Sequence, residues 1–219
     1  MNKTTKSMLI VLSVILLMTG AVMGTIAYLT DSHEVVNTFT VGNVDIKLDE
    51  TDVTEDGEPI PGADRVPGNE YHLIPGKSYV KDPTVTVVAG SEESYIRMMV
   101  TINCISELKA IFGNDFLPEN YVEGWDPAVW ACASVSEDTA NNTATYEFRY
   151  YKAVDAYESQ DDIVLEPLFT SFTMPGEVNN AQLATLADLE IKVVGHAIQT
   201  VTFANADEAW VSFDGQVNP

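Results

Sequence analysis

The residues near the start of this chain whose types could do chemistry are His33 and Glu34, which open the stretch HEVVN at residues 33–37. Zinc proteases carry H-E-x-x-H on a helix, where two imidazoles one turn apart bind the metal and the glutamate is the general base. Here Asn37 occupies the fifth position, so the second imidazole is missing, and the neighbouring residues favour a strand. We therefore predict no zinc in this stretch and assign no catalytic residue and no metal ligand to the chain.

Other candidate chemistry is sparse. Residues 52–57 imitate the start of an EF-hand loop, but the glutamate expected at position twelve is replaced by Ala63. A loose Ca²⁺ site in this acidic loop stays open as the one cofactor that the sequence allows. His72 and His196 stand alone, and no G-x-S-x-G nucleophile pattern occurs. The sequence thus predicts a protein that is not an enzyme, with a metalloprotease as the alternative.

Cys104 and Cys132 are the two cysteines of the chain. In an oxidising exterior they could form a disulfide, although two cysteines in a chain of this size do not make a disulfide scaffold. The alternative is a pair of buried small thiols. The sequence leaves both alternatives open.

The first 27 residues have the pattern of a secretory signal peptide. A short polar start with two lysines and no acid precedes an apolar run from Met8 to Met23. Signal peptidases need small side chains at the last residue before the cut and two residues before that, and Ala27 and Thr25 fit. We expect cleavage before Tyr28, which would release residues 28–219 as a secreted protein of the cell surface or extracellular space. The alternative is a retained anchor, because residues 8–29 are long enough to span a bilayer.

The charge of the chain excludes some partners. It has 11 basic and 33 acidic residues, and losing the two leader lysines would leave 9 basic residues and a net charge of about −24. Nucleic acids and anionic membrane surfaces would repel such a protein. We expect no nucleic-acid partner and, after cleavage, no membrane partner.

Residues 28–219 alternate in twos rather than at helical spacing, which is typical of strands that are buried on one face. One such face carries Ile96, Met98, Val100, Ile102 and Cys104. Turn-rich segments separate the strands, and short helices are expected only at residues 106–113 and 205–210. The sequence predicts one all-β domain, an antiparallel β-sandwich of jelly-roll type. The other expected strands cover residues 44–48, 85–89, 129–135, 143–151, 163–173 and 189–203, the last with a bulge at Gly195.

Several segments resemble one family of exported proteins. Residues 24–31 (GTIAYLTD) and 37–46 (NTFTVGNVDI) resemble the TasA/camelysin group of Firmicutes, and the chain is similar to alternate-signal proteins that a SipW-type peptidase processes. Weaker similarity covers residues 73–97 and 197–210. This resemblance implies a jelly roll, export by the general secretory route and a structural role in the extracellular matrix or biofilm, whereas the camelysin name implies a metalloendopeptidase.

The resemblance also implies a way of assembling. Subunits of the TasA group form fibres when the mature N-terminus of one subunit inserts as a strand into the next, so the expected partners are further copies or related matrix subunits. The candidate donor strand is residues 28–41, in which Val35, Asn37, Phe39 and Val41 share one face. The alternative is that this segment pairs within its own domain as a first strand.

Aromatic residues suggest a second function. Exposed rings on a β-sandwich could stack on sugars and make a monomeric module that binds the cell wall or a polysaccharide. Trp125 and Trp130 lie in or near a loop and are the candidates. Tyr146, Phe148 and Tyr150 alternate along one strand, and we predict that they face the core.

Overall fold

The computed structural model describes residues 43–114 and 116–217. The leader, its cleavage residues (Thr25, Ala27 and Tyr28), the HEVVN stretch and the candidate donor strand with Val35, Asn37, Phe39 and Val41 lie outside the described residues. The described residues form one compact unit.

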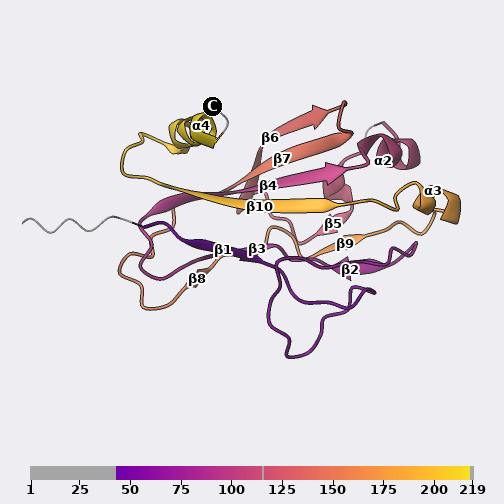
Figure 1. The fold of residues 1–219 in the computed structure, drawn as a ribbon, viewed down its shortest axis with the longest axis horizontal. Coiled ribbons are helices and arrows are strands. Elements are labelled where there is room, and N and C mark those ends of the chain that lie inside the picture. Colours follow the sequence, from indigo (N-terminus) through magenta and orange to yellow (C-terminus); the bar gives the residue numbers. More distant parts are fainter. Residues whose placement is uncertain (1–42, 115, 218–219) are drawn as a thin grey trace, which may run out of the picture. The chain divides into compact units, whose positions relative to one another are not determined.

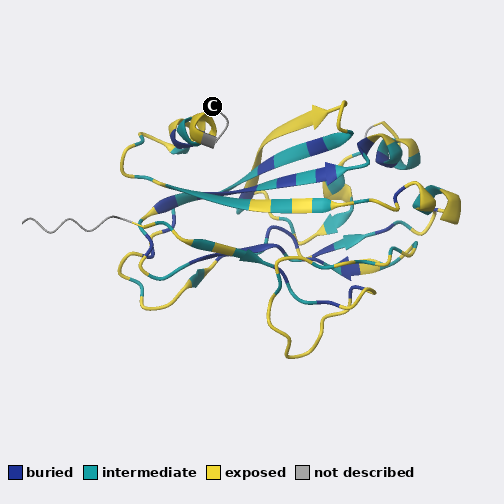
Figure 2. Cartoon of the chain, in the orientation of Figure 1, coloured by how far each residue is buried: buried dark blue, intermediate teal, exposed yellow. Residues whose placement is uncertain are grey.

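Four antiparallel strands make the upper layer in Figure 1, in the order β10-β4-β7-β6. These are β4 (Ser94–Asn103), β6 (Trp130–Asp138), β7 (Thr143–Tyr150) and β10 (Ile191–Gln199). The alternating apolar residues of β4 (Ile96, Met98, Val100 and Ile102) are buried on the face that looks toward the other layer, as the sequence predicts. Figure 2 shows the same alternation of buried and half-buried positions along β4 and β7.

Two three-stranded sheets make the other layer, β1-β3-β8 and β2-β9-β5. Their strands are β1 (Ile46–Asp49), β2 (Ser78–Val80), β3 (Thr84–Val87), β5 (Val122–Glu123), β8 (Ile163–Val164) and β9 (Ser171–Thr173). Between the two sheets the Lys81 N–H donates to the Thr170 carbonyl (3.2 Å), and the Leu168 N–H donates to the Pro83 carbonyl (3.0 Å). Strands β2 and β3 therefore run as one bent ladder along β9 and β8, and Pro83, which has no N–H, falls in the bend.

The chain crosses between the layers at most steps. It passes from β3 to β4, from β4 to β5, from β5 to β6, from β7 to β8 and from β9 to β10, and the β6–β7 pair is a hairpin within the upper layer. Repeated crossing between two antiparallel layers is the connectivity of Greek-key sandwiches, to which jelly rolls belong. The predicted all-β antiparallel sandwich is confirmed.

Some predicted elements differ from the observed ones. Residues 163–173 form two short strands rather than one, and β10 ends at Gln199 rather than running to Phe203. The bulge at Gly195 was predicted wrongly, because Gly195 pairs in regular register with Met98. A Cβ at Gly195 would lie 3.4 Å from Ile46 Cδ1 and 3.5 Å from Val85 Cγ2, so glycine lets the two layers approach closely there. The described residues place a register irregularity instead in β6, between Cys132 and Ser134.

Three short α-helices and a 3₁₀ turn complete the described residues: α2 (Ile105–Phe112), η1 (Pro118–Asn120), α3 (Asn180–Ala184) and α4 (Ala206–Val217). The predicted helix at residues 106–113 is confirmed as α2, and the terminal helix extends to Val217. Helix α3 was not predicted, although Asn179 and Gln182 form a complete capping box at its start.

Helix α4 packs on the outer face of the upper layer, and Arg97 of β4 anchors it. The Arg97 side chain is only 3% exposed and donates to Asp214 at 2.5 and 3.2 Å and to Glu147 at 3.3 Å. Its guanidinium carbon lies 4.5 Å from the Trp210 ring centre and 5.0 Å from that of Phe213. One buried cation thus joins the sheet to both the carboxylate and the aromatic rings of the helix.

Candidate functional site

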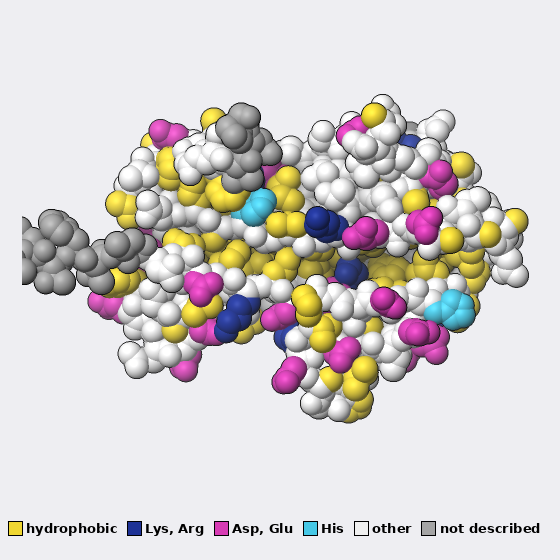
Figure 3. Space-filling view, in the orientation of Figure 1, with side chains coloured by type: hydrophobic (Ala, Val, Ile, Leu, Met, Phe, Trp, Pro, Cys, Tyr) yellow, Lys and Arg dark blue, Asp and Glu magenta, His cyan; other side chains and the backbone are white. Residues whose placement is uncertain are grey.

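A cleft of about 1060 Å³ opens between the two layers of the sandwich. In the space-filling view, yellow hydrophobic side chains line a groove that crosses this face between the two halves (Figure 3). The lining comes from the inner faces of both layers and from helix α2. It includes Val100, Ile102, Leu108, Phe112, Tyr121, Tyr146, Phe148, Leu168, Phe169, Phe172, Leu189, Ile191 and Val193.

One rim of the cleft is the edge strand β10. This strand is outermost in its sheet, so its other edge has no hydrogen-bonded neighbour among the described residues. Ile191 and Val193 point from β10 toward the inside of the sandwich, opposite the buried Ile102 and Val100, yet both are only partly buried. An unpaired edge beside half-covered apolar side chains can accept another strand.

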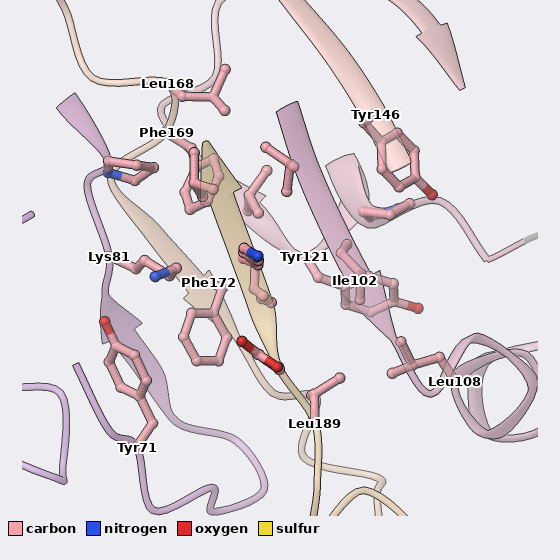
Figure 4. A pocket seen from close by; sticks show the side chains of 18 of the residues that line it. Tyr71, Lys81, Ile102, Leu108, Tyr121, Tyr146, Leu168, Phe169, Phe172 and Leu189 are labelled. Atoms are coloured by element: carbon pink, nitrogen blue, oxygen red, sulfur yellow. The ribbon is translucent and has the colours of Figure 1, made fainter. Parts of the chain in front are cut away.

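The cleft ends where the layers close at Gly195, and the opposite rim is the end of β1 with residues 67–73. Aromatic rings stiffen this side, because Tyr79 stacks on Phe172 (5.0 Å between centroids) and Tyr71 meets both rings edge-on (5.8 and 5.3 Å). Figure 4 shows Tyr71, Lys81 and Phe172 on one side of the pocket, and Tyr121, Ile102 and Leu108 on the other. The walls are therefore largely apolar and held by packing.

A buried ion pair interrupts the apolar lining. Lys81 Nζ lies 2.6 Å from Glu50 Oε2, and both side chains are less than a tenth exposed. The Asn69 amide donates to Glu50 Oε1 (2.9 Å), and the Lys81 ammonium lies 5.8 Å from the Tyr71 ring centre. Burial, together with the charge of Glu50, raises the pKa of Tyr71 well above its ordinary value, so this phenol is neutral and donates to the Val80 carbonyl (3.0 Å).

The structure brings none of the isolated histidines into a catalytic arrangement. His72 is exposed at the cleft rim, and His196 accepts a hydrogen bond from Arg97 at Nδ1 (3.2 Å) and packs on Phe213. Burial and the Arg97 charge lower the pKa of His196, consistent with a neutral ring. Across residues 43–114 and 116–217, no three His, Cys, Asp or Glu side chains are grouped to hold a metal ion, and this includes the loop at residues 52–57.

Cys104 and Cys132 are free thiols, so the disulfide alternative is wrong within one subunit. In the strand register Cys132 pairs with Phe148 of β7, and Phe148 in turn pairs with Met98 of β4. Cys104 lies six residues beyond Met98, which is about 20 Å along the strand. A disulfide needs Cα atoms within about 7 Å. The buried-thiol alternative is wrong for Cys132, which is exposed, whereas Cys104 is half-buried.

We expect a thiol reagent to modify Cys132 well before Cys104. Partial burial of each sulfur and nearby carboxylates raise the pKa of both thiols, so both should react slowly at pH 7 and faster toward pH 9. Mass spectrometry after timed labelling with iodoacetamide measures the order, and Cys132→Ser should remove the faster site. Equal rates at the two cysteines would contradict this placement.

The aromatic candidates for sugar binding are mostly core residues. Trp130 is fully buried and donates from Nε1 to the Glu166 carbonyl (2.9 Å), while Trp125 is half-buried and donates to the Trp130 carbonyl (2.8 Å). Tyr146, Phe148 and Tyr150 pack against the core, as predicted. A flat sugar-stacking platform at Trp125 and Trp130 is therefore not formed.

The described residues thus define a class: an antiparallel β-sandwich with an apolar cleft beside an open strand edge. Comparison with protein-family models, with curated proteins and with solved structures finds no match to this chain. Within the described part of the chain, every helix is too short or too polar to cross a bilayer.

Proposed function

We propose that this chain is a secreted, non-enzymatic subunit of a bacterial surface or extracellular matrix that assembles by strand addition. In this proposal residues 28–41 of one copy, freed by signal cleavage, occupy the cleft of the next copy. The observation that carries the proposal is the apolar cleft along the edge of β10 that no other described strand pairs with.

The proposed contact uses both the backbone and the side chains of the incoming strand. The backbone of the incoming segment would pair with the free edge of β10, which gives affinity without regard to sequence. Its side chains at every second position would enter the cleft, because successive residues of a strand point to opposite faces. Val35, Phe39 and Val41 have that spacing, and residues 35–41 extend over about 20 Å, comparable to the length of a typical strand.

The position at which the described chain begins supports a donor from another copy rather than from the same chain. The Asn43 carbonyl accepts from Glu92, and Asp45 pairs with Val88, so the chain enters at the turn of residues 88–92. The next residues form β1, in which Ile46 and Leu48 lie against Gly195 of β10, so the two layers are already in contact at this end. A segment from the same chain would have to fold back past this closed end, whereas a neighbour's segment can enter from the open side.

Removing residues 28–41 is expected to abolish assembly. The chain of residues 28–219 should form oligomers or fibres that grow with concentration, and the chain of residues 42–219, which keeps the core, should stay monomeric. Light scattering over a concentration series and electron microscopy measure both. Polymers of the shortened chain equal to those of the parent would refute the mechanism. Monomers of both, with a lower melting temperature only for the shortened chain, would show that the segment is a first strand of its own domain.

A matched pair of substitutions on β10 tests the cleft itself. Val193→Asp places a carboxylate on the cleft face, where the side chain is partly buried in the free subunit and would be fully buried by an incoming strand, so assembly should weaken about 100-fold or more. Thermal unfolding checks that this variant is folded. Val194→Asp, one residue along on the opposite face, should leave assembly unchanged. Equal effects of the two substitutions would remove the cleft from the proposal.

A further inference from the structure

The ion pair in the cleft has hydrogen-bonding capacity left over. A lysine ammonium has three donors and a carboxylate accepts about four hydrogen bonds. In the described part of the chain, Lys81 donates one hydrogen bond, to Glu50, and Glu50 accepts from Lys81 and Asn69. Both groups line the cleft, so an occupant that covers them without polar atoms leaves this capacity unmet.

The candidate donor strand carries one polar residue on its apolar face. Val35, Asn37, Phe39 and Val41 alternate on that face, and Asn37 is the only one able to hydrogen-bond through its side chain. A carboxamide has one acceptor oxygen and two N–H donors. It can accept from Lys81 through its oxygen and donate to Glu50 through its nitrogen at the same time, whereas the valine and phenylalanine side chains on this face can do neither.

We propose that Glu50 and Lys81 select the register of the bound strand by pairing with the carboxamide of Asn37; this inference rests on the proposed function. A shift of one residue would turn Thr38 and Thr40 into the cleft, because a one-residue slip exchanges the two faces of a strand. A shift of two residues would place Val35 or Phe39 over the ion pair and cover two charges without a partner. Only one register meets both the apolar lining and the ion pair.

The register model is tested with synthetic peptides of residues 28–41 and the chain of residues 42–219, which forms a compact unit with its own core. Isothermal titration should show that Asn37→Leu weakens peptide binding about 10- to 100-fold, the range expected when buried polar groups lose a partner. Thr38→Val, on the opposite face of the same peptide, is the matched control and should bind like the parent.

A second receptor variant makes the test specific to the ion pair. Replacing both partners, as Glu50→Leu with Lys81→Met, removes the charges without leaving one unpaired. Against this double variant the Asn37→Leu peptide should bind at least as tightly as the parent peptide, a reversal of preference. Thermal unfolding checks that the double variant is folded; if it is not, the comparison of Asn37→Leu with Thr38→Val on the unchanged receptor decides.

The outcomes separate the two proposals. A parent peptide that does not bind refutes the proposed function and with it the register model. Two outcomes would refute the register model alone and leave strand addition standing. In the first, the Asn37→Leu peptide binds as tightly as the parent peptide. In the second, Asn37→Leu weakens binding to the double variant as much as it weakens binding to the unchanged receptor.

Discussion

Replacing Arg97 by methionine is expected to lower the free energy of unfolding by about 3 kcal/mol and to loosen helix α4. Methionine keeps much of the apolar stem but removes the cation that pairs with Glu147 and Asp214 and lies against Trp210. Breaking a buried pair usually costs about 3–5 kcal/mol. The lower end applies here because Arg149 still pairs with Glu147 at 2.7 Å. Urea unfolding followed by circular dichroism measures the loss.

Two controls isolate the buried cation. Lys152→Met removes an exposed positive charge and should change stability by less than about 0.5 kcal/mol. Hydrogen exchange should show that α4 of the Arg97→Met variant loses more protection than β4 and β7, whose protection falls by no more than the global loss of stability. A loss near that of Lys152→Met would mean that Arg97 does not hold the helix.

The same substitution should change the acid dependence of stability. Arg97 lowers the pKa of Asp214. Burial alone would raise the pKa of Glu147, but its contacts with Arg149, Ser134 and Arg97 outweigh burial and hold that pKa below its ordinary value. Carboxylates with a lowered pKa in the folded state stabilise it above about pH 4 and lose that contribution as the pH falls. The parent should therefore lose stability below about pH 4 more steeply than Arg97→Met.

Replacing Trp130 by alanine is expected to lower the free energy of unfolding by about 3–5 kcal/mol. Trp130 is one of the largest fully buried side chains of the described residues, and its ring lies 4.9 Å from that of Tyr150. In the parent the indole N–H of Trp130 donates to the Glu166 carbonyl (2.9 Å). The substitution leaves a cavity and leaves this carbonyl without its hydrogen-bond donor. Tyr157→Ala, at a side chain that is 60% exposed, should cost less than about 0.5 kcal/mol.

This prediction also decides between core and sugar-binding roles for Trp130. If Trp130→Ala is nearly as stable as the parent but no longer pulls down with peptidoglycan, the residue is exposed in solution and the carbohydrate alternative is favoured. A large loss of stability, measured by calorimetry, supports the core placement.

The period-two alternation predicted the sandwich because each long strand buries one face, and that need is written locally in the order of apolar and polar residues. It predicted β4 and β7 well, for the same reason. It missed β2 and β5, which span three and two residues, too few to show an alternation. It misread Gly195, because a glycine that permits close packing of layers looks, in sequence, like a glycine in a bulge.

The candidate site was not predictable in the same way. Its ion pair joins Glu50 to Lys81, and its walls join β4 to residues beyond Leu168, so no local pattern contains it. The two cysteines were also ambiguous, since their separation depends on which strands pair.

The sequence by itself determined the layered β-architecture, the acidic surface and a leader-like start, because these depend on residue type and short-range spacing. Tertiary structure decided where the layers close and where they leave a cleft, which strand edge has no neighbour among the described residues and which charges become buried together. These depend on contacts between residues tens of positions apart, which arise only when the strands have found their neighbours.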